Sequence, residues 1–420
     1  MDMDLSRRGF VGAGAAFFAA MGGRSAWADG DGHREKRIVD GAGGFEEKID
    51  VSTLDPTPWT PFSDRKVRVG IAGEGACDFG DQFGYQSHPN VTVVACTDLF
   101  PDRCAKLQYR TGAQKTYPSC EEMIRHAAED KLDAVYIATD APSHITLAIL
   151  ALEHGLNVAT AVPAFFGKDQ LDLVPKLLDA VRRSGKVYMM NETTAFRQSC
   201  YEMRKLYEAG ALGRLAYAEG EYWHFANPKT GLGTASYKGW RDGMPPMYYA
   251  THSTGFYTCV AHKRFTEVAC IGQKSVRPIY ADGNAYGNPF GAEFAFLKGE
   301  DGAAARMVVS FDVPCVDGER GRVWGMKGGY DDATCKFLGD EAAIAGIRYK
   351  KPQLPPGMDP GWHGGSHGYL TDDFIRAILL KDHRVCVDVI TALNTTAAGV
   401  YAHLSALKGG ETLKIPEFSL

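Results

Sequence analysis

The fold of this chain is set by the stretch Val67-Arg68-Val69-Gly70-Ile71-Ala72-Gly73-Glu74-Gly75-Ala76-Cys77-Asp78-Phe79-Gly80. A short apolar run leads directly into glycines, which is typical of a buried strand that turns tightly into a helix. Glycines at this turn let the backbone approach a pyrophosphate at the helix N-terminus. The third glycine of the fingerprint falls on Asp78, and Gly80 comes two residues later. The stretch predicts a nucleotide-binding turn, with a glycine turn in a nucleotide-free α/β domain as the alternative.

Short apolar runs and helical segments alternate from this stretch to residue 192. The segments 145–154 and 171–184 repeat apolar residues at three- and four-residue intervals, as helices that cover a parallel sheet do. The expected strands are 67–72, 91–97, 134–138, 158–160 and 187–190. We therefore predict an α/β fold with a doubly wound parallel sheet, a Rossmann domain, over residues 64–192.

The pattern changes after about residue 210. Alternating apolar and polar residues predict strands at 215–223, 290–297 and 303–311, and long helices are few until 369–381. We expect a second domain over residues 193–420 that is dominated by a sheet. The last helix, 389–408, is apolar over its length and is expected to pack on either domain.

A carboxylate stands where a nucleotide ribose would be held. The second expected strand ends in Cys96-Thr97-Asp98, about 20 residues beyond the glycines, where an acidic residue grips the ribose hydroxyls of NAD. Asp98 would repel a 2′-phosphate. The cofactor expected is therefore NAD, in preference to NADP.

The N-terminal residues have the features of an export signal. Ser6-Arg7-Arg8-Gly9-Phe10 is followed by an apolar run to Met21 and by Ala26-Trp27-Ala28. This predicts a twin-arginine signal over residues 1–28, which would carry the folded protein, with its cofactor loaded, to the periplasm. A membrane anchor is the alternative, but the run is shorter than the ~20 residues that a span needs. Residues 29–63 are expected to form an arm or linker.

Composition points to a small-molecule partner. The 420 residues carry a formal charge of −5 without a basic run beyond the signal, which argues against nucleic acid as a partner. The ten cysteines contain no Cys-x-x-Cys pair, which argues against a structural zinc site and a disulfide-dense scaffold. A disulfide formed after export is left open.

Two further stretches carry a resemblance to a known family. With Ala138-Thr139-Asp140-Ala141-Pro142-Ser143-His144 and Gly155-Leu156-Asn157-Val158-Ala159-Thr160-Ala161-Val162-Pro163, residues 65–410 resemble the Gfo/Idh/MocA oxidoreductases of sugar metabolism. The resemblance implies a Rossmann domain, then an α/β domain with a large open, mainly antiparallel sheet, and an active site between them at the nicotinamide. It implies cofactor contacts from Gly73, Gly75, Ala76, Cys77, Asp98, Thr139, His144, Ala161, Val162, Pro163 and Glu192.

The resemblance also identifies candidate catalytic residues. Ordinary members handle the hydroxyl proton with a lysine and an Asp-x-x-x-His pair; here Val162 and Tyr248 replace the first two, and His252 is kept. We hypothesise that His252 takes or orients the hydroxyl proton, because imidazole has a pKa near neutral pH. Tyr249, three residues earlier, would face the same cleft as a proton donor or sugar platform. Core packing is the alternative for each.

One branch of the family also lacks the lysine, the NAD-using α-N-acetylgalactosaminidases of glycoside hydrolase family 109. Its motifs resemble Ala161-Val162-Pro163, Tyr188-Met189-Met190-Asn191-Glu192, Tyr249-Ala250-Thr251-His252 and Trp362-His363-Gly364-Gly365-Ser366-His367. A stretch that carries a tyrosine near the sugar in those hydrolases reads Cys315-Val316-Asp317-Gly318-Glu319-Arg320 here. That difference leaves the identity of the sugar open.

Further polar and aromatic residues are candidates for substrate contacts. Tyr222 and His224 share one face of an expected strand, Trp240 would stack on a sugar ring, and Arg241 would hold a hydroxyl or an acidic substituent. A buried aromatic cluster is the alternative. His363 and His367 have metal-ligand spacing, but the glycines between them interrupt a helix, and the family motif implies a place in the sugar cleft. We expect no metal.

These observations leave three functions open. The first is an exported oxidoreductase that acts on a sugar with a tightly bound NAD, because the periplasm offers no NAD pool for exchange. The second is a glycoside hydrolase or lyase that oxidises, eliminates, hydrates and reduces within one cycle. The third is a non-catalytic sugar-binding relative. The resemblance further implies a homo-oligomer.

Overall fold

The structure is a computed structural model that describes residues 49, 51–75, 77–225, 236–382 and 384–420. All of these residues fall within one compact unit. The expected signal 1–28 and most of the expected arm 29–63 lie outside them, and both stay predictions. Of the helices in this described part, none has the length and apolar character needed to cross a bilayer.

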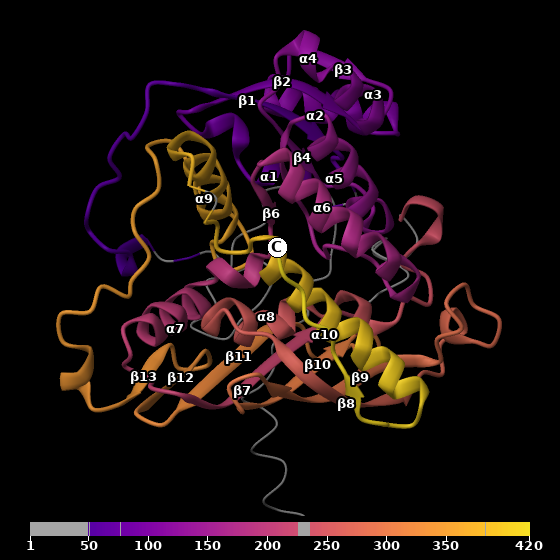
Figure 1. The fold of residues 1–420 in the computed structure, drawn as a ribbon, viewed down its shortest axis with the longest axis vertical. Coiled ribbons are helices and arrows are strands. Elements are labelled where there is room, and N and C mark those ends of the chain that lie inside the picture. Colours follow the sequence, from indigo (N-terminus) through magenta and orange to yellow (C-terminus); the bar gives the residue numbers. More distant parts are fainter. Residues whose placement is uncertain (1–48, 50, 76, 226–235, 383) are drawn as a thin grey trace, which may run out of the picture. The chain divides into compact units, whose positions relative to one another are not determined.

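The first sheet is a parallel sheet of Rossmann type (Figure 1). Its strand order is β3-β2-β1-β4-β5-β6. The strands are β1 (Val67–Ala72), β2 (Val91–Thr97), β3 (Lys115–Tyr117), β4 (Ala134–Ile137), β5 (Asn157–Thr160) and β6 (Tyr188–Met190). The helices are α1 (Phe79–Gln82), α2 (Pro101–Thr111), α3 (Cys120–Arg125), α4 (Ala127–Asp130), α5 (His144–Glu153) and α6 (Val174–Ser184).

Strand composition explains why this sheet forms. Val67, Val69 and Ile71 of β1 are fully buried, as expected for a central parallel strand covered on both faces by helices. β1 pairs with β2 on one side and with β4 on the other, so the chain reverses its direction of winding between β1 and β4. Ligands bind at such a switch point, beyond the carboxyl ends of the strands.

The second sheet has the order β13-β12-β11-β7-β10-β9-β8-β14 and is antiparallel except between β7 and β10. This confirms the predicted open, mainly antiparallel sheet. Its strands are β7 (Leu215–Trp223), β8 (Phe265–Lys274), β9 (Phe290–Gly299), β10 (Ala304–Ser310), β11 (Gly318–Gly325), β12 (Gly328–Asp331), β13 (Lys336–Gly339) and β14 (Leu413–Lys414).

Three helices form the layer between the two sheets in Figure 1: α7 (Gln198–Glu208), α8 (Thr251–Ala261) and α10 (Val389–Leu407). α8 contacts β7 and β11, and α10 contacts β8 and α8 as well as β6 and α6. The last helix therefore packs on both parts of the molecule. α9 (His367–Leu380) packs on β1 in addition, which sequence analysis did not predict.

The expected strands 67–72, 91–97 and 215–223 are confirmed at both ends, and the other expected strands differ by one or two residues. The short strand β3 was missed because its three residues are half-buried or exposed. β11 to β13 were missed because glycines interrupt their alternation. The described part of the arm contains one short 3-10 turn, Val51–Thr53, and Trp59 donates a hydrogen bond to Asp372 of α9 at 3.2 Å.

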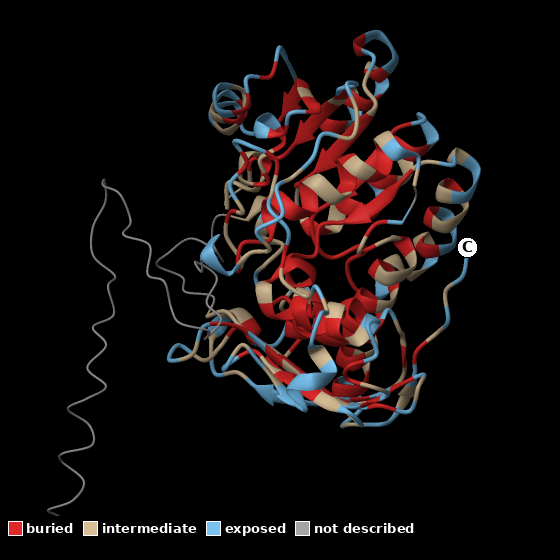
Figure 2. Ribbon diagram, turned by 90° about the vertical axis from the view of Figure 1, so that its left-hand side faces the viewer, coloured by how far each residue is buried: buried red, intermediate tan, exposed pale blue. Residues whose placement is uncertain are grey.

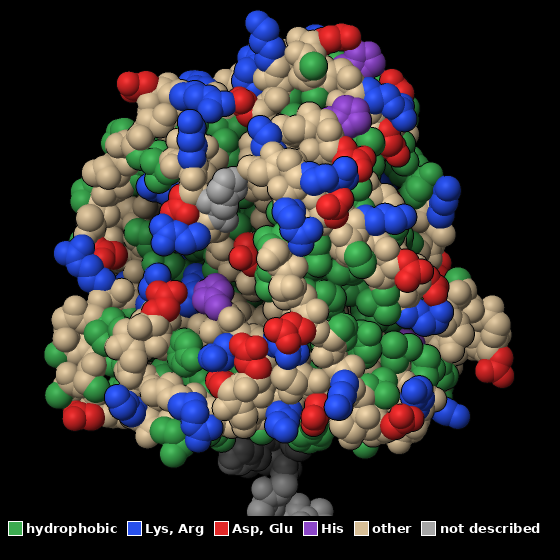
Figure 3. Space-filling view, in the orientation of Figure 1, with side chains coloured by type: hydrophobic (Ala, Val, Ile, Leu, Met, Phe, Trp, Pro, Cys, Tyr) green, Lys and Arg blue, Asp and Glu red, His purple; other side chains and the backbone are tan. Residues whose placement is uncertain are grey.

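Burial follows the layers. Figure 2 shows buried residues in both sheets and in the helices between them, and exposed residues along the outer face of the second sheet. On the face in Figure 3, acidic and basic side chains are interspersed, in keeping with the small formal charge.

Close contact between α8 and β7 depends on Gly220. A Cβ at this position would lie 2.0 Å from the carbonyl oxygen of Ser253 in α8. We expect Gly220→Ala to lower the free energy of unfolding by roughly 1–3 kcal/mol, because the helix must move off the sheet. Urea unfolding followed by circular dichroism measures this change. Ala216→Val, at an exposed position of the same strand, should stay within about 0.5 kcal/mol of the unsubstituted protein; equal losses would contradict the prediction.

Candidate functional site

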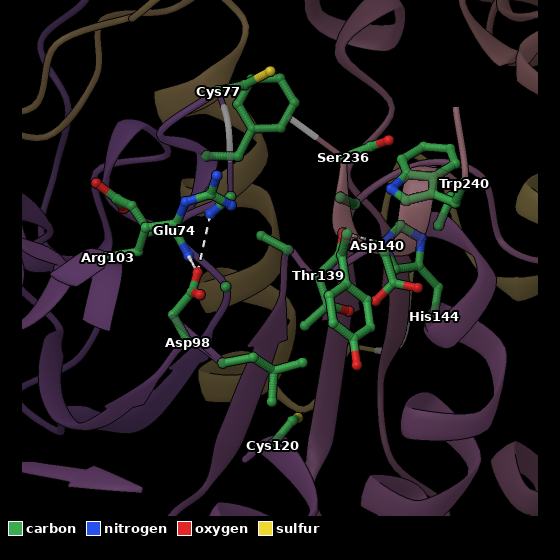
Figure 4. Close-up of a pocket in the computed structure, with 18 of the residues that line it drawn as sticks. Glu74, Cys77, Asp98, Arg103, Cys120, Thr139, Asp140, His144, Ser236 and Trp240 are labelled. Carbon is green, nitrogen blue, oxygen red and sulfur yellow. Dashed lines mark hydrogen bonds between the residues drawn. The ribbon is translucent and has the colours of Figure 1, made fainter. Parts of the chain in front are cut away.

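A pocket of about 940 Å³, which includes its open mouth, lies at the carboxyl edge of the parallel sheet (Figure 4). One wall is the glycine turn after β1 together with the ends of β2, β4 and β5. The other wall is the segment 236–249, which follows the second sheet's first strand. The residues that line the pocket include Gly73, Gly75, Cys77, Asp98, Thr139, His144, Ala161, Val162, Trp240, Arg241 and Tyr249. Ten predicted cofactor or substrate residues and Tyr249 thus come together. Ala76 lies outside the described residues.

The glycine turn has the conformation that the fingerprint requires. Gly73 and Gly75 adopt positive φ of 92° and 68°, and a Cβ on Gly73 would lie 2.5 Å from the carbonyl oxygen of Ala138 in the neighbouring turn. Gly80 takes the role of the third glycine, since a Cβ there would lie 2.6 Å from the carbonyl oxygen of Gly73. Gly80 comes two residues later than the third glycine of the fingerprint because the turn is longer here, and α1 still packs against β1.

Asp98 fixes the same turn. One carboxylate oxygen accepts from the backbone N–H groups of Glu74 at 2.9 Å and Gly75 at 3.2 Å, and the other accepts from Phe100 at 2.9 Å. Figure 4 shows the carboxylate at the turn. Asp98 lines the pocket at the end of β2, which is the position expected of a ribose ligand.

Glu74 places a carboxyl group beneath the turn. Burial, with the neighbouring Asp81 and Asp78, raises its pKa to about 7. Lys106 lies 3.3 Å from one of its oxygens. The group is therefore about half protonated near pH 7, which reduces the negative charge at a turn that faces a diphosphate. Together with the glycine cradle, these contacts show that the residues present fit NAD.

His144 joins the two turns that follow β4 and β5. Its ring nitrogens lie 2.9 Å from the carbonyl oxygen of Pro163 and 3.2 Å from that of Thr139. Burial lowers the pKa of His144, so the ring is neutral and one nitrogen donates at a time. The pocket is lined by Ala161 and Val162 of the second turn, while Pro163 contributes its carbonyl to His144.

The predicted catalytic histidine lies in a buried cluster with two carboxylates. His252, in the first turn of α8, places Nδ1 2.9 Å from Glu192 and 3.5 Å from Glu319. Both carboxylates are fully buried, and His252 is 5% exposed. Thr194 donates through its backbone N–H to Glu192 at 2.9 Å and through its hydroxyl to Glu319 at 2.8 Å. Nε2 of His252 makes no hydrogen bond within the described part of the chain.

The carboxylates set the charge of His252. Burial by itself lowers the pKa of this imidazole, but the Glu192 and Glu319 carboxylates raise it above its ordinary value of 6.5. Burial likewise opposes ionisation of Glu192, and the His252 imidazolium holds the pKa of that carboxyl below its ordinary value. A carboxylate on Nδ1 leaves Nε2 as the atom that exchanges a proton with a ligand.

Glu192 was predicted to contact the cofactor, but it does not line the pocket. It begins the 3-10 turn Thr193–Phe196 after β6 and holds His252 in place. Glu319, on β11, is the carboxylate that sequence analysis missed. It lies opposite Tyr222, 97 residues away in the sequence (319 − 222), so only the pairing of β7 with β11 reveals it.

Aromatic rings surround His252. The ring centroids of Tyr222, Tyr249 and His363 lie 4.7, 5.6 and 6.3 Å from that of His252, and the His363 ring is stacked on it. His363 Nδ1 lies 3.0 Å from Nε2 of His367, whose ring stacks on Phe83. His367 is fully buried, and neither it nor His363 lines the pocket.

The remaining substrate candidates lie in two places, at the pocket wall and at the end of β7. Trp240 and Arg241 line the pocket, with the Arg241 guanidinium carbon 4.2 Å from the Trp240 ring centroid and 5.2 Å from that of Tyr249. His224 lies at the end of β7, 3.4 Å from Asp317. Within the described residues, no three His, Cys, Asp or Glu side chains are grouped as metal ligands.

The Rossmann part of the chain matches a known protein family. A sequence model of the oxidoreductase family Gfo/Idh/MocA, with an NAD-binding Rossmann fold, matches residues 67–192. That segment holds the glycine turn and Asp98, and it ends at Glu192.

Curated relatives match over a segment of similar length. The chain is 32% identical over 166 residues to glycosyl hydrolase family 109 protein 1 of Bacteroides thetaiotaomicron, covering 38% of this chain and 34% of the relative. It is 29% identical over 100 residues to an α-N-acetylgalactosaminidase of Bacteroides fragilis, covering 24% and 23%. The matches thus span about a third of the relatives' length or less.

Solved structures share the fold over most of both chains. Myo-inositol 2-dehydrogenase from Lactobacillus plantarum superposes with a TM-score of 0.64 at 17% identity, over 84% of this chain and 100% of that one. Scyllo-inositol dehydrogenase from Lactobacillus casei, with bound NAD(H) and scyllo-inositol, has a TM-score of 0.63 at 15% identity, over 83% and 99%. Residues 67–192 thus form an NAD-binding Rossmann domain of the Gfo/Idh/MocA oxidoreductase family, and the chain resembles the glycosyl hydrolase family 109 proteins.

Proposed function

We propose that this protein is an NAD-dependent enzyme that transfers a hydride to and from a sugar or glycoside. The observation that carries the proposal is the position of His252, which is bound to two buried carboxylates and lies 5.6 Å, between ring centroids, from Tyr249 on the pocket wall. A proton-exchanging group thus adjoins the nucleotide pocket, as alcohol oxidation requires.

NAD would be held by the glycine turn 73–77, by Asp98 and by the turns at Thr139 and Val162. When bound, it accepts and returns a hydride at the sugar carbon. Val162 supplies no charge where ordinary members have a lysine. His252 is therefore the group that takes the hydroxyl proton at Nε2, while Glu192 at Nδ1 stabilises the imidazolium that results. Tyr249 and Trp240 offer aromatic faces to the sugar ring.

A second candidate is glycoside cleavage by transient oxidation. Two observations favour it: the missing lysine at Val162, and the relatives named glycosyl hydrolase family 109 and α-N-acetylgalactosaminidase. Oxidation of a ring hydroxyl to a ketone acidifies the neighbouring C–H. The leaving group is then eliminated, water adds, and the hydride returns, so that no net oxidation occurs. A non-catalytic sugar-binding role would leave the buried His252 cluster without a purpose.

We propose that the protein is exported by the twin-arginine route, and such export would favour a cycle that returns the hydride within each turnover. Ser6-Arg7-Arg8-Gly9-Phe10 and the apolar run that follows would deliver the folded protein with its nucleotide to the periplasm. A nucleotide that stays bound must regain its oxidation state in every turnover. We further propose that the protein is a homo-oligomer, with sedimentation as the test.

Replacement of His252 tests the proton transfer. His252→Ala should lower kcat by about 100-fold or more, the share that general acid–base catalysis usually contributes. NAD affinity should stay within about twofold, because His252 does not line the nucleotide pocket. Turnover and NAD titration measure the two effects. His262→Asn, at the exposed far end of α8, is the matched control and should behave like the unsubstituted protein. Full activity in His252→Ala would remove the proposed role.

The carboxylates should govern the pH dependence. As proton acceptor, His252 must be neutral, so kcat/KM for oxidation rises with pH through its pKa, which lies above 6.5. Glu192→Gln removes a negative charge and should lower that pKa, moving the acidic limb to lower pH; Glu319→Gln should act in the same direction. NMR titration of the His252 Cε1–H signal checks the shift without turnover. Glu293→Gln, at the separate buried Glu293–His403 pair, should leave the signal unchanged; an unshifted signal in Glu192→Gln would refute the coupling.

The closed cycle predicts a spectroscopic result. Protein purified from the periplasm should retain NAD after dialysis, and a panel of nitrophenyl glycosides should release nitrophenol without a lasting rise of NADH absorbance. A sample without glycoside is the control. An empty protein that takes up NAD and accumulates NADH would instead identify an ordinary dehydrogenase.

A further inference from the structure

A fully buried lysine connects two segments that adjoin the catalytic cluster. Lys351 has no exposed surface, and its Nζ donates to the carbonyl oxygens of Phe196 and Gly365 at 2.7 Å and lies 3.2 Å from that of Gly364. The ammonium also lies 4.5 Å from the Tyr369 ring centroid. Its three N–H groups thus match three backbone acceptors.

The three carbonyls belong to segments that reach His252. Phe196 ends the turn that begins after Glu192, the residue bonded to His252 Nδ1. Gly364 and Gly365 follow His363, whose ring is stacked on His252. These two glycines have φ of 65° and 66°, a conformation that bends the loop so that both carbonyls meet one nitrogen.

The backbone of Lys351 joins a third segment. Its carbonyl accepts from the N–H of Asp55 in the N-terminal arm at 2.7 Å, and Ile49 of the arm packs on Gly365, where a Cβ would lie 2.6 Å from its Cγ2 atom. The arm, the histidine loop 363–367 and the turn 193–196 therefore meet at one residue.

Such a group is costly to bury. Burial, together with the nearby Arg197, lowers the pKa of Lys351 well below its ordinary value. Among the described residues, no carboxylate is within ion-pair distance of it, so the charge is balanced by carbonyl dipoles, by the Tyr369 ring and, at longer range, by Glu202. A methionine of similar length would fill the same space without this desolvation cost.

We propose that Lys351 is a positioning residue, whose ammonium fixes the histidine loop 363–367 against the turn 193–196 so that His363 and Glu192 keep their places beside His252. The proposal rests on the proposed function for the role of His252. Lys351 itself touches neither the pocket nor the reacting atoms, and it acts through these two neighbours.

The test compares Lys351→Met and Lys351→Gln with Lys351→Arg. The first two should lower kcat roughly tenfold or more and leave NAD affinity within about twofold, because the nucleotide pocket is untouched. Both should also lower the midpoint of the His252 NMR titration, since Glu192 loses its fixed place. Lys351→Arg keeps the hydrogen-bond donors and the charge, so this variant should retain most of the kcat and most of the titration midpoint of the unsubstituted protein. Lys350→Met is the matched control, because Lys350 pairs with Glu202 at 2.7 Å instead.

Each outcome decides the proposal. A His252 titration and kcat that match the unsubstituted protein in Lys351→Met would overturn it. Loss of folding in both Lys351→Met and Lys351→Gln would assign Lys351 to overall stability and would overturn it as well. If the unsubstituted protein turned over no sugar, the proposed function would fail, and the NMR titration would still test the positioning by Lys351.

Discussion

Two carboxylates buried beside one imidazole are the constraint on which the rest of the site depends. Glu192 and Glu319 are fully buried, and each needs a positive partner and hydrogen-bond donors to remain ionised. His252 and Thr194 supply these, and Arg197 lies 3.8 Å from Glu319. Glu192 follows the last Rossmann strand, His252 begins α8, and Glu319 belongs to the second sheet. The cluster thus ties three parts of the fold at one point.

The same constraint links packing to chemistry. α8 can present His252 to Glu319 only because Gly220 lets the helix approach β7 closely. The cluster also sets the charge of His252, because two carboxylates favour its protonated form against the effect of burial.

Local patterns were enough to predict the Rossmann half of the site. Glycines after an apolar run and a carboxylate at the end of the next strand are close in sequence, and the structure places Gly73, Gly75 and Asp98 around one pocket. Gly80 was harder to assign because the fingerprint counts residues, whereas the packing requirement concerns the approach of α1 to the carbonyl of Gly73. His252 was predicted through a family resemblance, and the spacing alone did not distinguish it from a core histidine.

Glu319 and Lys351 were not predicted because their contacts join residues that are far apart in the sequence. Glu319 reaches His252 because β11 pairs with β7, and Lys351 reaches the histidine loop because three segments from residues 49 to 365 converge on it. Neither contact produces a periodic pattern in the sequence. In a single sequence, a buried acid or lysine looks like an exposed one, and its function follows only when the partners that compensate its charge are known. The carboxylates of this site are therefore informative because they are buried, and the neighbour whose charge they control is His252.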